Sequence, residues 1–283
     1  MKKFFLFVFL TGLLFACSGC AQGNAGKPSA AKADSVGPAD ADSLADVPKG
    51  AQALIKAYPQ CKLKYEDNKI IFADGSSMVY DDGVEKDFIA RLDNADIEDM
   101  FVYKYDMGPK PEFQADGGRC RCDAFFMKIY GNNAGEVRKH LVNINWYGKN
   151  LLVSAVNGVN KQLEAIQKDL SSMPEYNKYF TDCGGTFNWR VVRGTKNRLS
   201  AHSYGMTMDV NTSFSNYWLW ENKGKAEDAV LDVYNNRIPE KIVEVFEKYG
   251  FIWGGRWYHY DTMHFEYRPE ILIYHGITPI FVE

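Results

Sequence analysis

The chain has 283 residues, of which 46% are hydrophobic and 14% aromatic, so it is long enough to bury a sizeable core. Its formal net charge is −3 at pH 7. Binding to nucleic acid needs clustered basic surface that neutralises phosphates, so this mild acidity argues against a nucleic-acid partner. We expect one large domain with appended segments, and the composition leaves the oligomeric state open.

Residues 1–16 have the features of a signal peptide. Two lysines precede the apolar run FFLFVFLTGLLFA (4–16), whose 13 residues are fewer than the ~20 that span a bilayer as a helix. The sequence LFAC that ends at Cys17 resembles the lipobox of bacterial lipoproteins, and Cys20 is a second candidate for the modified cysteine. The resemblance implies export and a lipid anchor on Cys17 or Cys20 in a bacterial membrane, with the chain facing the periplasm or the cell exterior.

Residues 17–50 are predicted to form a flexible tether. The stretch 21–50 consists almost entirely of Ala, Gly, Ser, Pro, Asp and Lys. Such a composition buries too little apolar surface to offset the entropy lost on ordering. The folded part is then 51–283, which we divide into an N-terminal extension (51–115), whose role the sequence does not define, and a C-terminal core (116–283).

The folded part contains the four cysteines Cys61, Cys120, Cys122 and Cys183. An exported chain lies in an oxidising compartment, so we expect disulfides. Four cysteines allow three pairings, which stay open, although the short span between Cys120 and Cys122 disfavours that pair. A cysteine metal site is the alternative, but these four cysteines include no C-x2-C pair to support it.

The first predicted elements are two short strands and a helix. Residues 68–81 suggest two strands around the turn residues Asp74-Gly75. Residues 122–130 place three apolar side chains at helical spacing, and Gly131 is the expected stop.

Two longer helices follow. Over 157–172 the apolar residues recur at steps of four, three and four, which is typical of an amphipathic helix. The second helix spans 239–249, with Pro239 at its first helical position and Gly250 as its terminator.

The periodicity changes to two in the segments MTMDVN (206–211) and TMHFEY (262–267). In each segment apolar residues alternate with polar ones, so each strand has one face for the core and one polar face. Helices mixed with such strands predict an α+β fold with a mainly antiparallel sheet flanked by helices.

Asp209 and His264 lie on the polar faces of these two strands. If the strands are neighbours, facing side chains lie ~4.5–5.5 Å apart at Cβ, close enough to hold one metal ion. His202 lies in the turn before the first strand, and Gly205 allows that turn to fold back toward the same point. Two histidines and one carboxylate leave a fourth tetrahedral position open, as in catalytic zinc sites.

Metal-assisted hydrolysis also needs a base outside the ligand set. Asp261 lies three residues before His264. Strand alternation would place it on the wrong face, so we expect it at the start of the strand or in the preceding loop, where alternation does not apply.

The order S-x-H-x-x-G-x-x-x-D followed about fifty residues later by D-x-x-H resembles the zinc D-Ala-D-Ala carboxypeptidase and L-alanyl-D-glutamate endopeptidase family, whose fold is shared with the hedgehog signalling domain. The residues that match this pattern are Ser200, His202, Gly205, Asp209, Asp261 and His264. The resemblance implies a hedgehog/DD-peptidase-like fold, a Zn2+ ion on His202, Asp209 and His264, and Asp261 as general base. It also implies hydrolysis of peptidoglycan stem peptides that contain D-amino acids.

Two departures from the family pattern bear on the reaction. Thr207 replaces the usual alanine, while Asp261 and Glu266 stand where carboxypeptidase members commonly have glutamate and a second histidine. The aspartate resembles the endopeptidase branch more closely, but both types stay open. Glu266 shares the face of His264, where it either orients that ligand or is an unrelated exposed carboxylate.

A cationic side chain is expected upstream of His202, because family members use an arginine there to contact the substrate carbonyl or carboxylate. Arg190 in FNWRVV is our candidate, with Arg193 and Arg198 as rivals. The alternative function is a hedgehog-like zinc-containing binding module without hydrolytic activity. The presence of Asp261 argues against this module, since a structural site needs no base.

Overall fold

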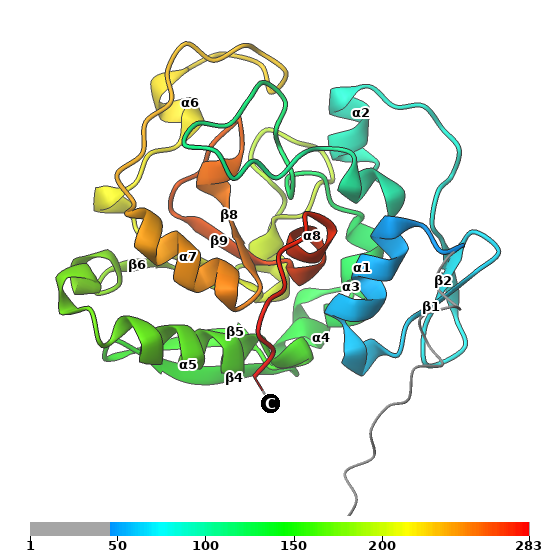
Figure 1. Ribbon diagram of the computed structural model, residues 1–283, viewed down its shortest axis with the longest axis horizontal. Coiled ribbons are helices and arrows are strands. Elements are labelled where there is room, and N and C mark those ends of the chain that lie inside the picture. Colours follow the sequence, from blue (N-terminus) through cyan, green and yellow to red (C-terminus); the bar gives the residue numbers. More distant parts are fainter. Residues whose placement is uncertain (1–45, 283) are drawn as a thin grey trace, which may run out of the picture. The chain divides into compact units, whose positions relative to one another are not determined.

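The structure is a computed structural model that describes residues 46–282, and the predicted signal peptide with nearly all of the predicted tether lies outside this range (Figure 1). All strand pairings in this part of the chain are antiparallel, and helices flank the sheets. The predicted α+β class is therefore confirmed. No helix among the described residues is long and apolar enough to cross a membrane.

The strands of the described residues form three sheets. One is a meander of β1 (Lys64–Glu66), β2 (Lys69–Ile71) and β3 (Ser77–Val79), and the second is a hairpin of β4 (Leu141–Trp146) and β5 (Lys149–Ser154). The third sheet has the order β6-β7-β9-β8, formed by β6 (Cys183–Gly185), β7 (Thr207–Asn211), β9 (His264–Tyr267) and β8 (Phe251–Trp253). The helices are α1 (Lys49–Ala57), α2 (Phe88–Asp93), α3 (Asp123–Tyr130), α4 (Ala134–Arg138), α5 (Val159–Leu170), α6 (Trp218–Glu221), α7 (Glu240–Lys248) and α8 (Pro269–Tyr274).

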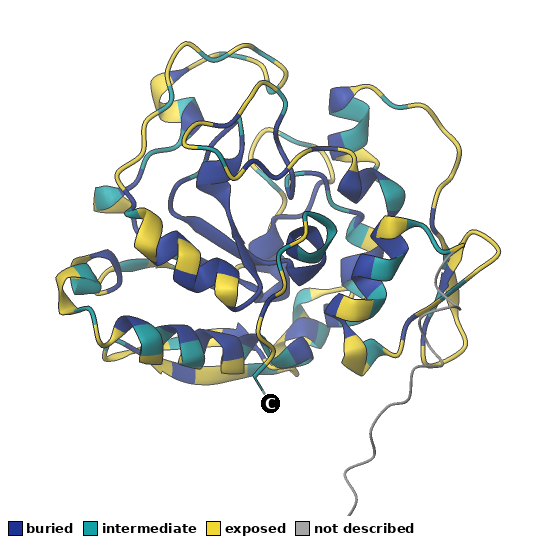
Figure 2. Ribbon diagram, viewed as in Figure 1, coloured by how far each residue is buried: buried dark blue, intermediate teal, exposed yellow. Residues whose placement is uncertain are grey.

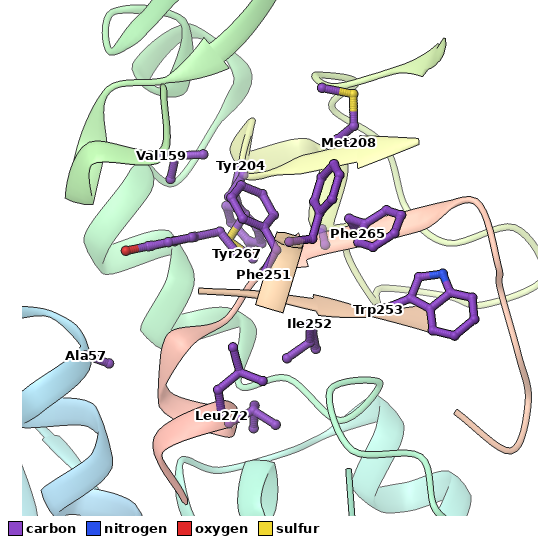
Figure 3. Close-up of a cluster of buried hydrophobic side chains, with 14 of the residues drawn as sticks. Ala57, Val159, Tyr204, Met208, Phe251, Ile252, Trp253, Phe265, Tyr267 and Leu272 are labelled. Carbon is purple, nitrogen blue, oxygen red and sulfur yellow. The ribbon is translucent and has the colours of Figure 1, made fainter. Parts of the chain in front are cut away.

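The four-stranded sheet holds the centre of the core. The apolar residues of β7 and β9 that the alternation assigned to one face, among them Met208 and Phe265, are fully buried (Figure 3). Helix α7 packs against β8, and Phe246 of α7 stacks on Phe265 with ring centroids 4.0 Å apart. Figure 2 shows α5 and α7 with one buried face and one exposed face, as their periodicity predicts.

The predicted elements are confirmed with small changes at their ends. Strands β2 and β3 lie on either side of Asp74-Gly75, and α3 ends at Tyr130, directly before the expected stop Gly131. Helix α5 begins at Val159 rather than 157, because Asn157 and Gly158 adopt left-handed backbone angles. Pro239 precedes α7 with extended backbone angles, so it is not the first helical residue as predicted.

The N-terminal extension (51–115) packs into the same core as residues 116–282. Helix α1 lies against α8 and begins at Lys49, two residues inside the predicted tether. Gly50 is buried there, and Tyr80 and Phe101 lie so close to it that a Cβ at this position would clash with both side chains. From the same extension, the Tyr105 hydroxyl donates a hydrogen bond of 2.7 Å to Glu247 of α7.

The predicted disulfides are absent, since all four cysteines of the described part are free thiols. The fold separates them: Cys122 lies in the main core, whereas Cys120 lies in a second small cluster with Phe88 of α2. Cys61 contacts Asn157, and Cys183 begins β6. Burial raises the pKa of the Cys61 and Cys122 thiols to about 11, so both are neutral near pH 7.

Candidate metal centre

Strand register brings two of the predicted ligands together. Strands β7 and β9 are neighbours in the sheet, and Asp209 is the direct partner of His264. His202 lies in the short 3-10 helix Ala201–Tyr204, which ends at Gly205 with a left-handed φ of 66°. A Cβ on Gly205 would come within 2.6 Å of Leu141, so glycine is needed for the turn that returns His202 to the strand.

The three side chains converge on one point. Nε2 of His202 lies 3.2 Å from one carboxylate oxygen of Asp209, and Nδ1 of His264 lies 3.1 Å from the other. One possible ligand atom from each residue lies within 4.8 Å of the others. Their assignment as metal ligands is a prediction from the sequence, and the geometry is consistent with it.

The remaining ring nitrogens have partners that suit a metal site. Nδ1 of His202 lies 2.9 Å from the carbonyl oxygen of Thr186, and Nε2 of His264 lies 3.1 Å from a Glu266 oxygen. Metal-binding histidines usually donate their second ring N–H to a carbonyl or carboxylate, which turns the other nitrogen toward the ion. The residues present therefore fit a bound metal.

Thr207 takes part in this arrangement. Its side chain is fully buried, and its hydroxyl lies 2.9 Å from Nδ1 of His202 and 3.0 Å from the Thr186 carbonyl oxygen. The alanine usual at this position in the family would make neither contact. Thr207, in place of the usual alanine, thus adds a polar contact to Nδ1 of His202.

The charged groups of the centre shift the pKa values of His264 and Asp209 in directions that favour a cation there. Burial lowers the pKa of His264, but hydrogen bonds and charge from Asp209 and Glu266 outweigh this effect and raise it to about 10. Burial raises the pKa of Asp209, yet the two histidines hold it well below its usual range. Two acidic groups around the histidines thus favour positive charge at this point.

Asp261 lies where the sequence reasoning expected it, before the start of β9. Its N–H donates to the Gly254 carbonyl (2.9 Å), its own carbonyl accepts from the His264 N–H (3.1 Å), and it forms an antiparallel bridge with Tyr217. Burial and the nearby Asp209 charge raise the pKa of Asp261 to about 6. A carboxyl group with a pKa near the working pH is suited to general base catalysis.

These residues line a cleft of about 1010 Å³, which contains His202, Asp209, Asp261 and His264. Ligand pockets are typically ~300–1,000 Å³, so the cleft has room for a substrate of several residues. Its walls also carry aromatic side chains of α6 and of the residue directly before this helix. One of them, Trp220, is 50% exposed.

The structure separates the three arginine candidates. Arg190 and Arg193 are exposed at the cleft, and neither guanidinium forms an ion pair with a residue of the described part. Arg198 also lines the cleft, but it is buried and binds Asp93 and Glu227, each at 2.7 Å. Arg190 and Arg193 are thus free to bind a substrate, whereas Arg198 is engaged.

The sequence reasoning missed several cleft residues. Arg119 and Arg121, from the segment GGRCRC, line the cleft although they are far from the predicted ligands in the sequence. Lys223 and Glu227 come from the loop after α6, which has no recognisable motif. His259 lines the cleft too, but it is 1% exposed and its Nδ1 lies 2.8 Å from Asp116.

An α+β fold that presents two histidines and a carboxylate beside a second, free carboxylate in a cleft is typical of a metallopeptidase with one metal ion. Residues 193–267 match the profile of a protein family described as "D-alanyl-D-alanine carboxypeptidase". The match covers about a quarter of the chain, supports the resemblance to zinc DD-peptidases recognised from the sequence, and supports a zinc peptidase that acts on peptidoglycan at this general level. No significant match was found among curated proteins or among solved structures.

Proposed function

We propose that this protein is a zinc metallopeptidase that hydrolyses amide bonds of peptidoglycan stem peptides containing D-amino acids, as an endopeptidase or a carboxypeptidase. The observation that carries the proposal is the convergence of His202, Asp209 and His264 in a cleft that also contains Asp261. A zinc ion on the three ligands would polarise the amide carbonyl and lower the pKa of a bound water.

The chain's own residues supply the proton transfers and the binding. Asp261 takes the proton of the attacking water and passes it to the leaving amine, as its raised pKa suits it to do. Arg190, whose guanidinium forms no ion pair within residues 46–282, donates hydrogen bonds to the developing oxyanion or to a substrate carboxylate. The Thr186 carbonyl oxygen accepts from Nδ1 of His202, and Glu266 accepts from Nε2 of His264. Both hydrogen bonds hold the histidine rings in place.

The site also suits an acidic peptide. Arg190, Arg193 and Lys223 bring positive charge to the cleft of a chain whose net charge is negative. Stem peptides carry several carboxylates, so this charge favours their approach. We further propose that the protein is exported and held in a bacterial membrane by lipid on Cys17 or Cys20, both of which lie outside the described residues.

The test is to incubate the purified protein, with and without added Zn2+, with muropeptides and to identify the products by mass spectrometry. Zinc-dependent release of a terminal D-amino acid indicates a carboxypeptidase, and a cut within the stem peptide indicates an endopeptidase. Stoichiometric zinc with intact muropeptides would instead identify a zinc-containing binding module, and absence of bound zinc would contradict both functions.

A further inference from the structure

A chain of buried polar side chains starts at the metal centre and runs through the protein interior. Nε2 of His264 lies 3.1 Å from Oε2 of Glu266, and the other oxygen of Glu266 accepts a hydrogen bond from Arg268 at 3.2 Å. Arg268 also binds Glu270, which in turn accepts a 2.6 Å hydrogen bond from the Tyr58 hydroxyl. Glu266, Arg268, Glu270 and Tyr58 are all 0% exposed.

Glu266 lies between two arginines. Besides Arg268, Arg121 places a guanidinium nitrogen 3.5 Å from Oε2 of Glu266. A second nitrogen of Arg121 donates to the Leu199 carbonyl at 3.0 Å, which fixes the guanidinium between the cleft and Glu266. The carboxylate therefore has a defined position, set from both sides by cations that are themselves anchored.

Stability alone does not account for this arrangement. Burying a charged group is costly, and buried ion pairs are often no more stable than apolar side chains of the same volume. What the carboxylate does provide is an acceptor at the one nitrogen of His264 that does not face Asp209. A proton held on Nε2 leaves the lone pair of Nδ1 free for a metal ion.

We propose that Glu266, clamped by Arg121 and Arg268, is a positioning residue that keeps the His264 proton on Nε2 and the Nδ1 lone pair directed at the metal. The clamp extends through Glu270 to Tyr58, the residue directly after α1, so that the N-terminal extension completes the support of the predicted metal ligand His264. This inference rests on the proposed function only in taking His264 as a zinc ligand.

The chain offers a matched control for a purely structural role. Glu247 is also a buried glutamate, 5% exposed, that binds an arginine (Arg256, 2.6 Å) and a tyrosine of the N-terminal extension (Tyr105, 2.7 Å). No predicted metal ligand touches it. Loss of its charge should therefore affect folding stability in the way that loss of the Glu266 charge does, without the effect on a histidine.

The experiment measures Zn2+ affinity of the purified protein by competition with a chromophoric chelator. Wild type is compared with Glu266→Gln, Glu266→Ala, Glu247→Gln and Arg121→Gln, and thermal unfolding is followed for each. The visible spectrum of the Co2+-substituted protein reports the ligand geometry at the same time. None of these readouts depends on cleavage of a peptide.

We expect Glu266→Gln to weaken zinc binding about 10- to 100-fold, Glu266→Ala to weaken it at least as much, and both to alter the Co2+ spectrum. Glu247→Gln should lower the unfolding temperature with wild-type zinc affinity. Wild-type affinity in both Glu266 variants, or an equal loss in Glu247→Gln, would overturn the proposal.

If the Glu266 variants do not fold, the zinc affinity of Arg121→Gln tests the proposal instead, because this substitution removes one of the two arginines that contact Glu266 and lies at the edge of the cleft. Weaker zinc binding in this variant supports the clamp, and unchanged binding overturns it. Failure of wild type to cleave muropeptides, with this affinity pattern intact, would refute the peptidase function but not the positioning role.

Discussion

The substitution Asp261→Asn separates catalysis from metal binding. Asparagine has the shape of aspartate, and the backbone hydrogen bonds of Asp261 to Gly254 and His264 do not involve the side chain. The start of β9 and the three predicted ligands should therefore stay in place. One carboxylate oxygen of Asp261 is buried and has no hydrogen-bond partner in the described part of the chain, so no contact to that part is lost there.

The expected loss of activity is large. General base catalysis contributes typically ~10²–10⁴-fold, which corresponds to about 3–5 kcal/mol in the activation barrier. Because Asp261 is outside the predicted ligand set, the zinc content should equal that of wild type. The effect should appear in kcat, with little change in KM.

The same substitution should stabilise the metal-free protein. The pKa of Asp261 is raised to about 6 in the folded protein, against about 3.9 in an unfolded chain. Folding therefore favours the protonated acid, and metal-free wild type loses stability as the pH rises from about 4 through about 6. Asparagine cannot ionise, so at pH 7 the variant should gain up to about 3 kcal/mol.

The assay is thermal unfolding with a chelator at pH 4, 5, 6 and 7, alongside kcat and zinc content at pH 7. The unfolding temperatures of variant and wild type should converge near pH 4 and separate as the pH rises. A constant difference across this range would show that the Asp261 pKa is not raised. Wild-type turnover with zinc retained would remove Asp261 from the mechanism.

Three further predictions test the ligands, the cationic side chain and the core. His202→Ala should lose stoichiometric zinc in elemental analysis, whereas His140→Ala, at an exposed position, should retain it; zinc retained in both would exclude His202 as a ligand. Arg190→Ala should lower kcat/KM by about 10²–10³-fold at an unchanged unfolding temperature, while Arg198→Ala should lower that temperature because it removes a buried side chain together with its ion pairs to Asp93 and Glu227; the reverse pattern would move the substrate role to Arg198. Phe246→Ala should lower the free energy of unfolding by about 3–5 kcal/mol in chemical denaturation, since the ring is fully buried, and a loss below about 1 kcal/mol would contradict that packing.

The sequence by itself determined the elements that present the centre. Alternation in 206–211 and 262–267 put Asp209 and His264 on the polar faces of two strands, because successive side chains of a strand point to opposite sides in any fold. Gly205 marked the turn, since the left-handed angle it adopts favours glycine. These are local properties of the backbone, so each segment shows them in the sequence whatever other parts of the chain pack against it.

Only the tertiary structure decided which side chains surround the centre. Glu266 could have been an exposed carboxylate, but its partner Arg121 is 145 residues away, and Tyr58 lies 212 residues from Glu270. Likewise, ion pairs with distant acids distinguish the buried Arg198 from the free Arg190. The expected disulfides are absent from the described residues for the same reason. Which cysteines meet depends on how the segments between them fold, and composition and spacing do not contain that information.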